Sequence, residues 1–406
     1  MLSNEMKWIR SNMALFNFEK NNEYLITLQN SGNLVVDFKK YANDFFDGAE
    51  RIIHYLSDEA AERQDIAKLD LWYFAMLYLY RQSLELLLKS TIFKYVTQKE
   101  DRKTIIGEIR HDLKEGLDML LEKIPDNEKY DNDAEINWLL LFFEDISRVD
   151  KDSDMFRYPF GNNLQILFDK QTHISLLATH ENMNRAYSIL NTIHECNAVY
   201  INEYESYEPQ LFIEGGHYYQ QSVVGYNYLG QSFYPYFTSY EEVGKHLEDL
   251  IKKEKYQDMF LPMCYIFRNA VELGLKQLIV EDSHIPREEA LKVLKKKKHS
   301  LVGLWNKIEA EIEQYANAPK GDTTIIDTRK YIQAFHDFDN SSDIFRYPTN
   351  RNLDTYFSTP KTFDMMNIAA CFHELCNFLS GVDSMLSEIK DYEAEMRSYY
   401  SDEMNY

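Results

Sequence analysis

Apolar residues recur every three or four positions along most of the 406-residue chain, and this spacing predicts a mainly α protein. In the first expected helix, for example, Tyr41, Phe45 and Ile52 would share one face. The predicted helices cover about 39–56, 69–96, 102–123, 134–149, 172–204, 240–255, 259–280, 287–314, 325–338 and 363–390. Before the first of them, two β-rich runs, Tyr24–Leu28 and Leu34–Phe38, flank an Asn-Ser-Gly turn and predict a short hairpin.

A six-residue motif occurs twice, 189 positions apart, as Asp154–Pro159 and Asp343–Pro348. Further blocks keep the same order and nearly the same offset, between 187 and 189 positions. These are Arg81-x3-Glu85-x3-Lys89 with Arg268-x3-Glu272-x3-Lys276, Arg110-His111 with Lys298-His299, and Asn163-Leu164 with Asn352-Leu353. Spaced blocks in one order at an almost constant offset predict a tandem duplication.

The repeat divides the chain into two homologous antiparallel helical bundles. We expect them to pack as an intramolecular pseudo-dimer, each preceded by a small β hairpin or loop element. Residues 1–37 are the expected N-terminal hairpin segment, 38–205 the first helical domain, 206–235 a Tyr- and Gly-rich connection, 236–395 the second helical domain, and 396–406 a polar tail that frays. The connection has the aromatic and glycine content of short strands or an ordered loop, so we expect it to open the second copy.

The formal net charge of −22 disfavours a protein coated with nucleic acid, because phosphate binding relies on clustered Lys and Arg. A local basic cleft for RNA or nucleotide remains one alternative, and an acidic, Tyr-rich surface that binds a protein partner or mimics nucleic acid is another. No run of about 18 apolar residues and no leader-like N-terminus is found. We therefore expect a cytoplasmic protein without membrane contact, and a homodimer is a further alternative.

The four cysteines form no disulfide pattern, which agrees with a reducing compartment. Cys371-x-His373-x2-Cys376 contains metal-ligand residue types, but Cys371 and Cys376 lie five positions apart on an expected helix and so point in different directions. Buried thiols are the simpler interpretation. No metal and no cofactor is expected, because the chain has no phosphate-binding glycine loop and no His-Glu-x2-His helix.

The repeated polar residues have a structural interpretation. Glu85 lies four positions after Arg81 on a strongly apolar helix, where an unpaired charge would be costly. In this interpretation a buried network fastens each Phe-Arg-Tyr-Pro loop to its bundle, and the loop arginine pairs with Glu85 or Glu272. The network residues are Glu85, Glu272, Asp154 and Asp343.

The same segments also have a functional interpretation, as a polar cleft suited to a phosphate or nucleotide. Its ligand-binding candidates are Arg81, Lys89, Arg110, Asn163, Arg268, Lys276, Lys298 and Asn352. Its catalytic candidates are His111, His299, Arg157 and Arg346. One of the two histidines lies in each half of the chain. Each directly follows a cationic residue that could hold a phosphate.

This arrangement resembles the HEPN superfamily. The likeness lies in a helical bundle with Arg-x3-Glu on an early helix, a later His-x-Leu, and an arginine loop before the last helix, over 38–205 and 236–395. It implies small, paired α-helical domains, many of which are metal-independent ribonucleases of toxin–antitoxin and phage-defence systems. It also implies a catalytic Arg followed, after four to six residues, by His, in a site completed across the pair.

Two positions depart from that pattern. Asn163 and Asn352 stand where the family's His is expected, and Asn cannot act as a general base near neutral pH. Arg329 is the only Arg with a His, His336, at the right distance, but this pair has no counterpart in the first half and falls one helix too early. We therefore predict that His336 is not a catalytic base.

Two hypotheses follow. The first is a HEPN-like protein of a bacterial or phage defence system that binds nucleotide or RNA without conventional ribonuclease activity; if it is an enzyme, it is a metal-independent ribonuclease. The second is a non-catalytic acidic interaction module, such as an inhibitor, adaptor or nucleic-acid mimic. Exposure of Arg81, His111 and Arg157 in a basic groove would favour the first hypothesis, and their burial with partners would favour the second.

Overall fold

A computed structural model describes residues 7–11, 14–19, 22–129, 132–161, 168, 170–196, 207–225 and 232–403. This part of the chain is mainly helical, as the spacing of apolar residues predicts. Its α-helices are α1 (Leu34–Tyr55), α2 (Ile66–Tyr95), α3 (Lys99–Ile109), α4 (Leu113–Lys123), α5 (Asp133–Asp150), α6 (Leu176–Glu195), α7 (Tyr234–Glu254), α8 (Phe260–Gln277), α9 (Arg287–Lys297), α10 (Leu301–Tyr315), α11 (Thr324–Phe338) and α12 (Met365–Glu403).

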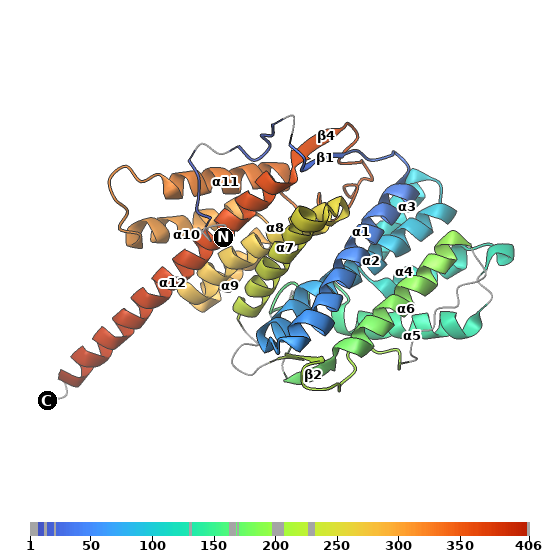
Figure 1. Cartoon of the computed structure of the whole chain (residues 1–406), viewed down its shortest axis with the longest axis horizontal. Helices are drawn as coiled ribbons and strands as arrows, with labels where there is room; N and C mark the ends of the chain where they lie inside the picture. The colour runs from blue at the N-terminus through green and yellow to red at the C-terminus, as the bar shows by residue number, and fades with distance from the viewer. Residues whose placement is uncertain are drawn as a thin grey trace.

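Helices α2 and α8 form the centre of the molecule (Figure 1). Every residue of α8 is buried, and between Leu69 and Phe93 of α2 all residues but Leu71 are buried. A helix that is apolar on all sides is covered on all sides. Helix α1 packs on α2 and α7 packs on α8, while α7 also contacts α2 and α1 contacts α8. Helices α4 and α6 cover α2, whereas α10 and α12 cover α8.

Four short strands form two antiparallel pairs, and each pair joins segments far apart in the chain. β1 (Leu25–Leu28) pairs with β4 (Lys361–Asp364), and β2 (Thr172–Ser175) pairs with β3 (Gln221–Val224). The strand that precedes α1 therefore pairs with the strand that precedes α12. In the same way, β3 on the approach to α7 pairs with the strand that precedes α6.

The predicted N-terminal hairpin is wrong. Its first run is β1, but Leu34–Phe38 is the first turn of α1 rather than a second strand. The side chain of Asn33 accepts a hydrogen bond from the backbone N–H of Val35, and Asp37 places a negative charge in the first turn. Both features favour a helix N-terminus over a β-turn.

Two predicted helices, 102–123 and 287–314, are each broken in two. The breaks fall at Arg110 and Lys298, whose φ angles are +46° and +50°. After each break a polar side chain caps the next helix: Asp112 accepts from the backbone N–H of Lys114 and Glu115, and Ser300 accepts from that of Gly303. Asp112 and Ser300 are residue types that favour a helix start. The sequence did not indicate the breaks before them, because Arg and Lys rarely adopt positive φ.

Further corrections concern element ends. The predicted helix 172–204 begins as strand β2, and α6 starts only at Leu176, where the side chain of Ser175 caps it. The polar tail 396–406, expected to fray over its last residues from Ser398, is instead helical to Glu403, and α12 continues well past the body of the molecule (Figure 1). The connection 206–235 contains β3, in agreement with the expectation of short strands.

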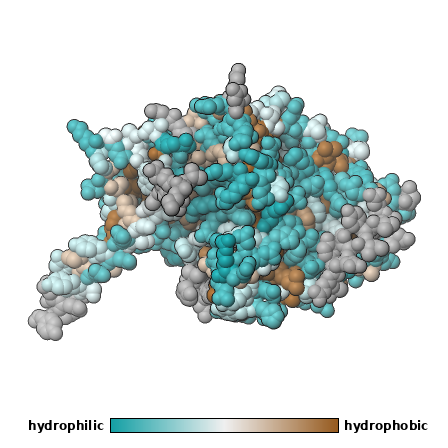
Figure 2. All heavy atoms as spheres, viewed as in Figure 1, coloured by the Kyte–Doolittle hydropathy of each residue, from teal (hydrophilic) through white to brown (hydrophobic). Residues whose placement is uncertain are grey.

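The face of the molecule drawn in Figure 2 is mainly hydrophilic, with small separate apolar areas. None of the helices that the structure describes combines the length and apolarity needed to cross a lipid bilayer.

Candidate functional site

Helix α2 carries three charged residues one turn apart, within its buried stretch. Arg81 donates to Oε2 of Glu85 at 2.8 Å, and Lys89 donates to Oε1 at 2.6 Å. All three side chains are buried, with at most 6% of their surface exposed. The positions i, i+4 and i+8 place them along one helix face, so the carboxylate lies between two cations.

The break between α3 and α4 brings His111 to this carboxylate. Its Nδ1 lies 3.1 and 3.2 Å from the two oxygens of Glu85, and its backbone carbonyl accepts a hydrogen bond from Arg81. The side chain of His111 is 31% exposed, which makes it the accessible member of the group. No hydrogen bond to its Nε2 occurs within the described part of the chain.

Tyr347 reaches the same carboxylate from the other end of the sequence. Its hydroxyl donates to Oε1 of Glu85 at 2.6 Å. The prediction that a loop arginine would pair with Glu85 is therefore wrong, since the tyrosine next to that arginine makes the contact. Arg346 instead binds Asp343 of its own loop at 3.0 Å. Arg346 and Tyr347 are adjacent in the loop, and their side chains reach different partners.

A second cluster has the same contacts around Glu272 of α8. Arg268 and Lys276 donate to its two oxygens at 2.5 and 2.7 Å, and Nδ1 of His299 lies 3.0 Å from Oε1. Tyr158 donates to Oε1 at 2.8 Å. Each cluster is thus completed by a tyrosine from the loop of the other half of the chain.

Two aspartates missing from the sequence predictions hold the loops in place. Oδ1 of Asp150, the last residue of α5, accepts from the backbone N–H of Asp154 at 2.8 Å and of Met155 at 3.0 Å. Oδ2 of the same residue lies 3.4 Å from Nε of Arg81. Asp339 repeats these contacts beside Arg268. The signal was present in the sequence, because Asp-x3-Asp precedes both copies of the loop.

The loop arginines lie where the two halves meet. Arg157 is held by Asp154 at 2.8 Å and lies 5.7 Å from the ring centre of Tyr78, on α2. Arg346 lies 5.7 Å from the ring of Tyr265, on α8. The two tyrosine rings stack with their centres 4.9 Å apart. Arginine over an aromatic face is a stabilising cation–π contact, so both arginines serve the interior of the molecule.

Opposite charges balance within this buried region. The cations are Arg81, Lys89, Arg157, Arg268, Lys276 and Arg346, and the carboxylates are Glu85, Asp150, Asp154, Glu272, Asp339 and Asp343. Six positive and six negative groups leave no net charge, which is what burial of ions requires. These arginines and lysines are therefore network residues and do not form an open basic groove.

The pKa values follow from burial and from these charges. Burial raises the pKa of Glu85, but Lys89, His111 and Arg81 outweigh it and hold that pKa well below the usual 4.5. For His111, the carboxylate of Glu85 raises the pKa, but burial and the cations of Lys89 and Arg346 outweigh it, so the pKa of His111 lies below its usual value. A neutral imidazole that donates from Nδ1 to an ionised carboxylate keeps a free lone pair on Nε2.

His299 has a lowered pKa for the same reasons, with Glu272 raising it and burial, Lys276 and Arg157 lowering it. Its side chain is 34% exposed. The residues directly before the two histidines, Arg110 and Lys298, are both exposed. Each site thus offers an accessible imidazole next to an accessible cation.

The remaining candidates lie elsewhere. Asn352 is exposed in a loop, and Asn163 lies outside the described residues. Arg329 is engaged by Glu309 at 2.5 Å and Glu313 at 3.5 Å on α10. Cys371 and Cys376 are both buried. In the part of the chain that the structure describes, the one group with metal-ligand geometry is Glu50, His54 and His180, which the sequence did not indicate because His180 follows 126 positions after His54.

Comparison with known proteins gave no match, whether with family models, curated proteins or solved structures. The resemblance to HEPN domains therefore rests on the residues of this chain alone.

Proposed function

We propose that this chain is a tandem HEPN-like protein whose two halves form an intramolecular pseudo-dimer and bind RNA or a nucleotide at two equivalent sites. The sites are Arg110 with His111 and Lys298 with His299. Duplication is supported by the equal offsets in sequence and by the contacts that recur around Glu85 and Glu272. The completion of each cluster by a tyrosine of the other half agrees with a site built across a pair.

One observation carries the proposal: both halves hold an exposed cation on strained backbone directly before an oriented imidazole. Arg110 and Lys298 have φ and ψ of 46° and −98°, and of 50° and −108°, respectively. A side-chain-bearing residue in such a conformation costs about 1–3 kcal/mol, and glycine would avoid this cost. A charged side chain at both positions therefore argues for a role of the charge itself, such as binding a phosphate.

The imidazole supplies the second contact. With Nδ1 held by a buried carboxylate, the lone pair of Nε2 is directed away from the network and can accept a hydrogen bond from a ribose hydroxyl. The same arrangement is that of a general base oriented by a carboxylate. Any cleavage of bound RNA is therefore expected to need His111 and His299 rather than Asn163, Asn352 or His336.

Binding of a short fluorescent single-stranded RNA, followed by anisotropy, tests this proposal. The test variant is Arg110→Gly with Lys298→Gly, which removes both charges and relieves the strained backbone, so its melting temperature should equal or exceed that of the wild type. We expect at least tenfold weaker binding and a salt dependence that is shallower by about one ion per lost phosphate contact.

Lys255→Gly is the matched control. Lys255 is also an exposed cation at positive φ (63°) after a helix, but it lies at the end of α7 and not before a histidine. It should leave binding unchanged. Absence of RNA and nucleotide binding in the wild type, or equal binding by the double variant, would refute the proposal. Gel electrophoresis of the RNA in the same samples measures cleavage. The double variant His111→Gln/His299→Gln and the variant His336→Ala are compared with the wild type in this assay.

A second candidate function is favoured by the burial of Arg81 and Arg157. Exposure of Arg81, His111 and Arg157 was expected to separate the two hypotheses. The two arginines are buried and paired, and only His111 is accessible. With the repeated arginines neutralised inside, the excess of acidic residues remains for the exterior. An acidic interaction module is then the expected function if no RNA or nucleotide binds.

A further inference from the structure

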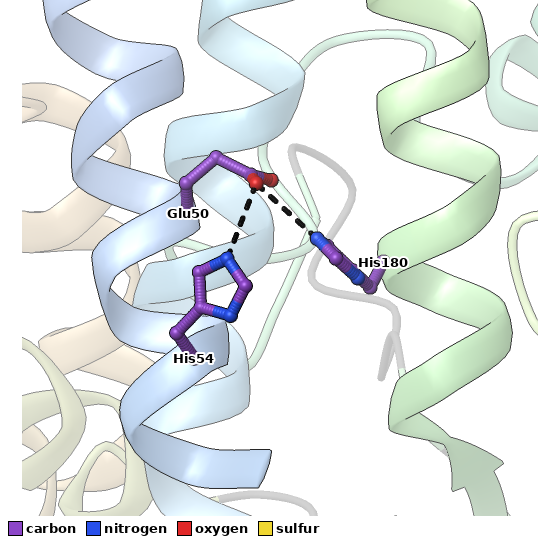
Figure 3. A group of neighbouring side chains, drawn as sticks. All are labelled: Glu50, His54 and His180. Atoms are coloured by element: carbon purple, nitrogen blue, oxygen red, sulfur yellow. Dashed lines mark hydrogen bonds and ion pairs between the residues drawn. The ribbon is translucent and has the colours of Figure 1, made fainter. Parts of the chain in front are cut away.

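Three side chains from α1 and α6 converge on one point (Figure 3). Glu50 and His54 lie one turn apart on α1, and His180 lies on α6. Oε2 of Glu50 is 3.2 Å from Nε2 of His180 and 3.7 Å from Nε2 of His54. All three atoms lie within 4.8 Å of one another.

The other carboxylate oxygen of Glu50 is already engaged. Its Oε1 accepts a hydrogen bond from the hydroxyl of Tyr80, on α2, and one from the side-chain amide of Asn184 at 2.8 Å. These two donors fix the carboxylate and leave Oε2 turned toward the imidazoles. Outer contacts of this kind orient the carboxylate ligands of metal sites.

An ion pair between Glu50 and His180 accounts for only part of the arrangement. The imidazole of His180, whose Nε2 lies 3.2 Å from Oε2 of Glu50, is enough to satisfy that oxygen. A second imidazole, from His54, has its Nε2 directed at the same oxygen although 59% of its side chain is exposed and free to point into solvent.

We propose that Glu50, His54 and His180 bind a divalent transition-metal ion, with zinc as the ion that suits two imidazoles and one carboxylate best. Tetrahedral zinc with ligand bonds of about 2.0–2.2 Å holds its ligand atoms about 3.3–3.5 Å apart. The two measured separations lie on either side of this range, and the exposed ring of His54 can rotate to adjust. Three protein ligands leave a fourth coordination position for a water molecule or another ligand.

Bound zinc would join α1 to α6 through side chains, in addition to the packing of both helices on α2. Because the ligands come together only in the folded chain, zinc should stabilise the native state by mass action. This site does not depend on the function proposed for His111 and His299.

Isothermal titration of metal-free full-length protein with zinc chloride tests the proposal, together with the visible spectrum of the cobalt-substituted protein. We expect one zinc ion per chain, a rise in melting temperature with zinc, and cobalt bands typical of tetrahedral coordination. Saturable binding should be lost in His54→Gln and in His180→Gln, and Tyr80→Phe should bind about 10- to 100-fold more weakly. His54 is exposed, so its variant should fold normally.

His284→Gln is the control for adventitious binding to surface histidines. Its two ring nitrogens lie 2.8 and 3.0 Å from Glu311 and Glu393, so the carboxylates flank opposite edges of the ring and cannot share one ion with it. This variant should bind zinc as the wild type does. Absence of stoichiometric zinc binding, or full binding after loss of either His54 or His180, would overturn the three-ligand site.

Discussion

The carboxylate of Glu85 is in hydrogen-bond contact with four side chains: Arg81, Lys89, His111 and Tyr347. Two of them, the arginine and the lysine, are buried cations. Lys89 has its only ion pair within the described residues with this carboxylate. The stability of this part of the core therefore depends on one side chain, and the network behaves as a unit rather than as separate pairs.

We predict that Glu85→Ala lowers the free energy of unfolding by roughly 3–5 kcal/mol, because it leaves Lys89 buried without its counter-ion. Glu272→Ala should act alike, through Lys276. The measurement is thermal or denaturant unfolding. Asp118→Ala, which removes an exposed i,i+4 partner of Lys114, is the control and should change stability by about 0.5 kcal/mol or less. A Glu85→Ala melting curve that overlays the wild type would contradict the prediction.

The sequence was informative about this residue up to a point. An Arg-x3-Glu pair on an apolar helix is enough to predict that both residues are buried, and both are buried. The pairing of Lys89 with the same carboxylate was not predicted, because Lys89 was a ligand-binding candidate. The partner from the loop was assigned to Arg346 instead of Tyr347, because pattern alone does not tell which of two adjacent side chains points inward. His111 was identified from its repetition, whereas its contact with Glu85 needed the break after α3.

At the scale of elements, the end of α5 and the loop that follows form one assembly. The carboxylate of Asp150 binds two backbone N–H groups of the loop and lies beside Arg81, so it connects α5, the loop and α2. Asp339 does the same for α11 and α8. The Phe-Arg-Tyr-Pro loops owe their fixed conformation to these aspartates, and their tyrosines can then reach across to the other half.

The pH dependence of stability tests the role of Asp150. Burial raises its pKa to about 6, although Arg81 and a backbone N–H oppose the rise. A carboxyl group whose folded pKa is raised favours the folded state below its unfolded pKa of 3.8, and that contribution is lost as the pH rises through about 6. Asp150→Asn resembles the protonated form at every pH.

We therefore predict that the stability of the wild type, relative to Asp150→Asn, falls by up to about 3 kcal/mol between pH 3 and pH 7, at about 1.4 kcal/mol per pH unit between the two pKa values. Urea unfolding of both proteins across this range measures it. Groups common to both proteins cancel in the difference. A difference that stays constant, or grows in favour of the wild type, would show that Asp150 remains ionised in the core.

The elements themselves were predictable to different degrees. Long apolar helices such as α2 and α8 were found within a few residues of their ends, because their periodicity extends over many turns. A strand at β1 and short strands in the segment that holds β3 were expected, but β2 and β4 were not, and neither was any pairing, since each strand has four residues and its partner lies far away in the sequence. Leu34–Phe38 has the composition of a strand, but Asn33 and Asp37 favour a helix start and decided the outcome.

At the scale of the whole molecule, the N-terminal and C-terminal parts of the chain exchange both strands and side chains. β1 pairs with β4, β3 pairs with β2, Tyr347 enters the cluster of α2, and Tyr158 enters that of α8. The bundles were expected to be neighbours, but their exchanged strands and tyrosines were outside the reach of sequence patterns. Each part supplies groups that the other part needs for a satisfied core.

We predict that fragments 1–205 and 206–406, produced separately, do not unfold cooperatively, because each lacks the tyrosine and the strand that complete it. Mixed in equal amounts, they should form a complex with the helical signal and melting behaviour of the intact chain. Circular dichroism and size-exclusion chromatography measure both. A fragment that is monomeric and melts near the temperature of the full-length protein would argue against this mutual dependence.

The pairing of β1 with β4 also has a consequence for the order in which the protein can be completed on the ribosome. Leu28 finds its partner Lys361 only after about 330 more residues have been added. At translation rates of about 5–20 residues per second, β1 waits roughly 15–70 s with its backbone groups unpaired. β1 thus emerges long before β4 yet is among the last elements to be finished, and a nascent chain that stops before β4 leaves the ribosome with an unpaired strand.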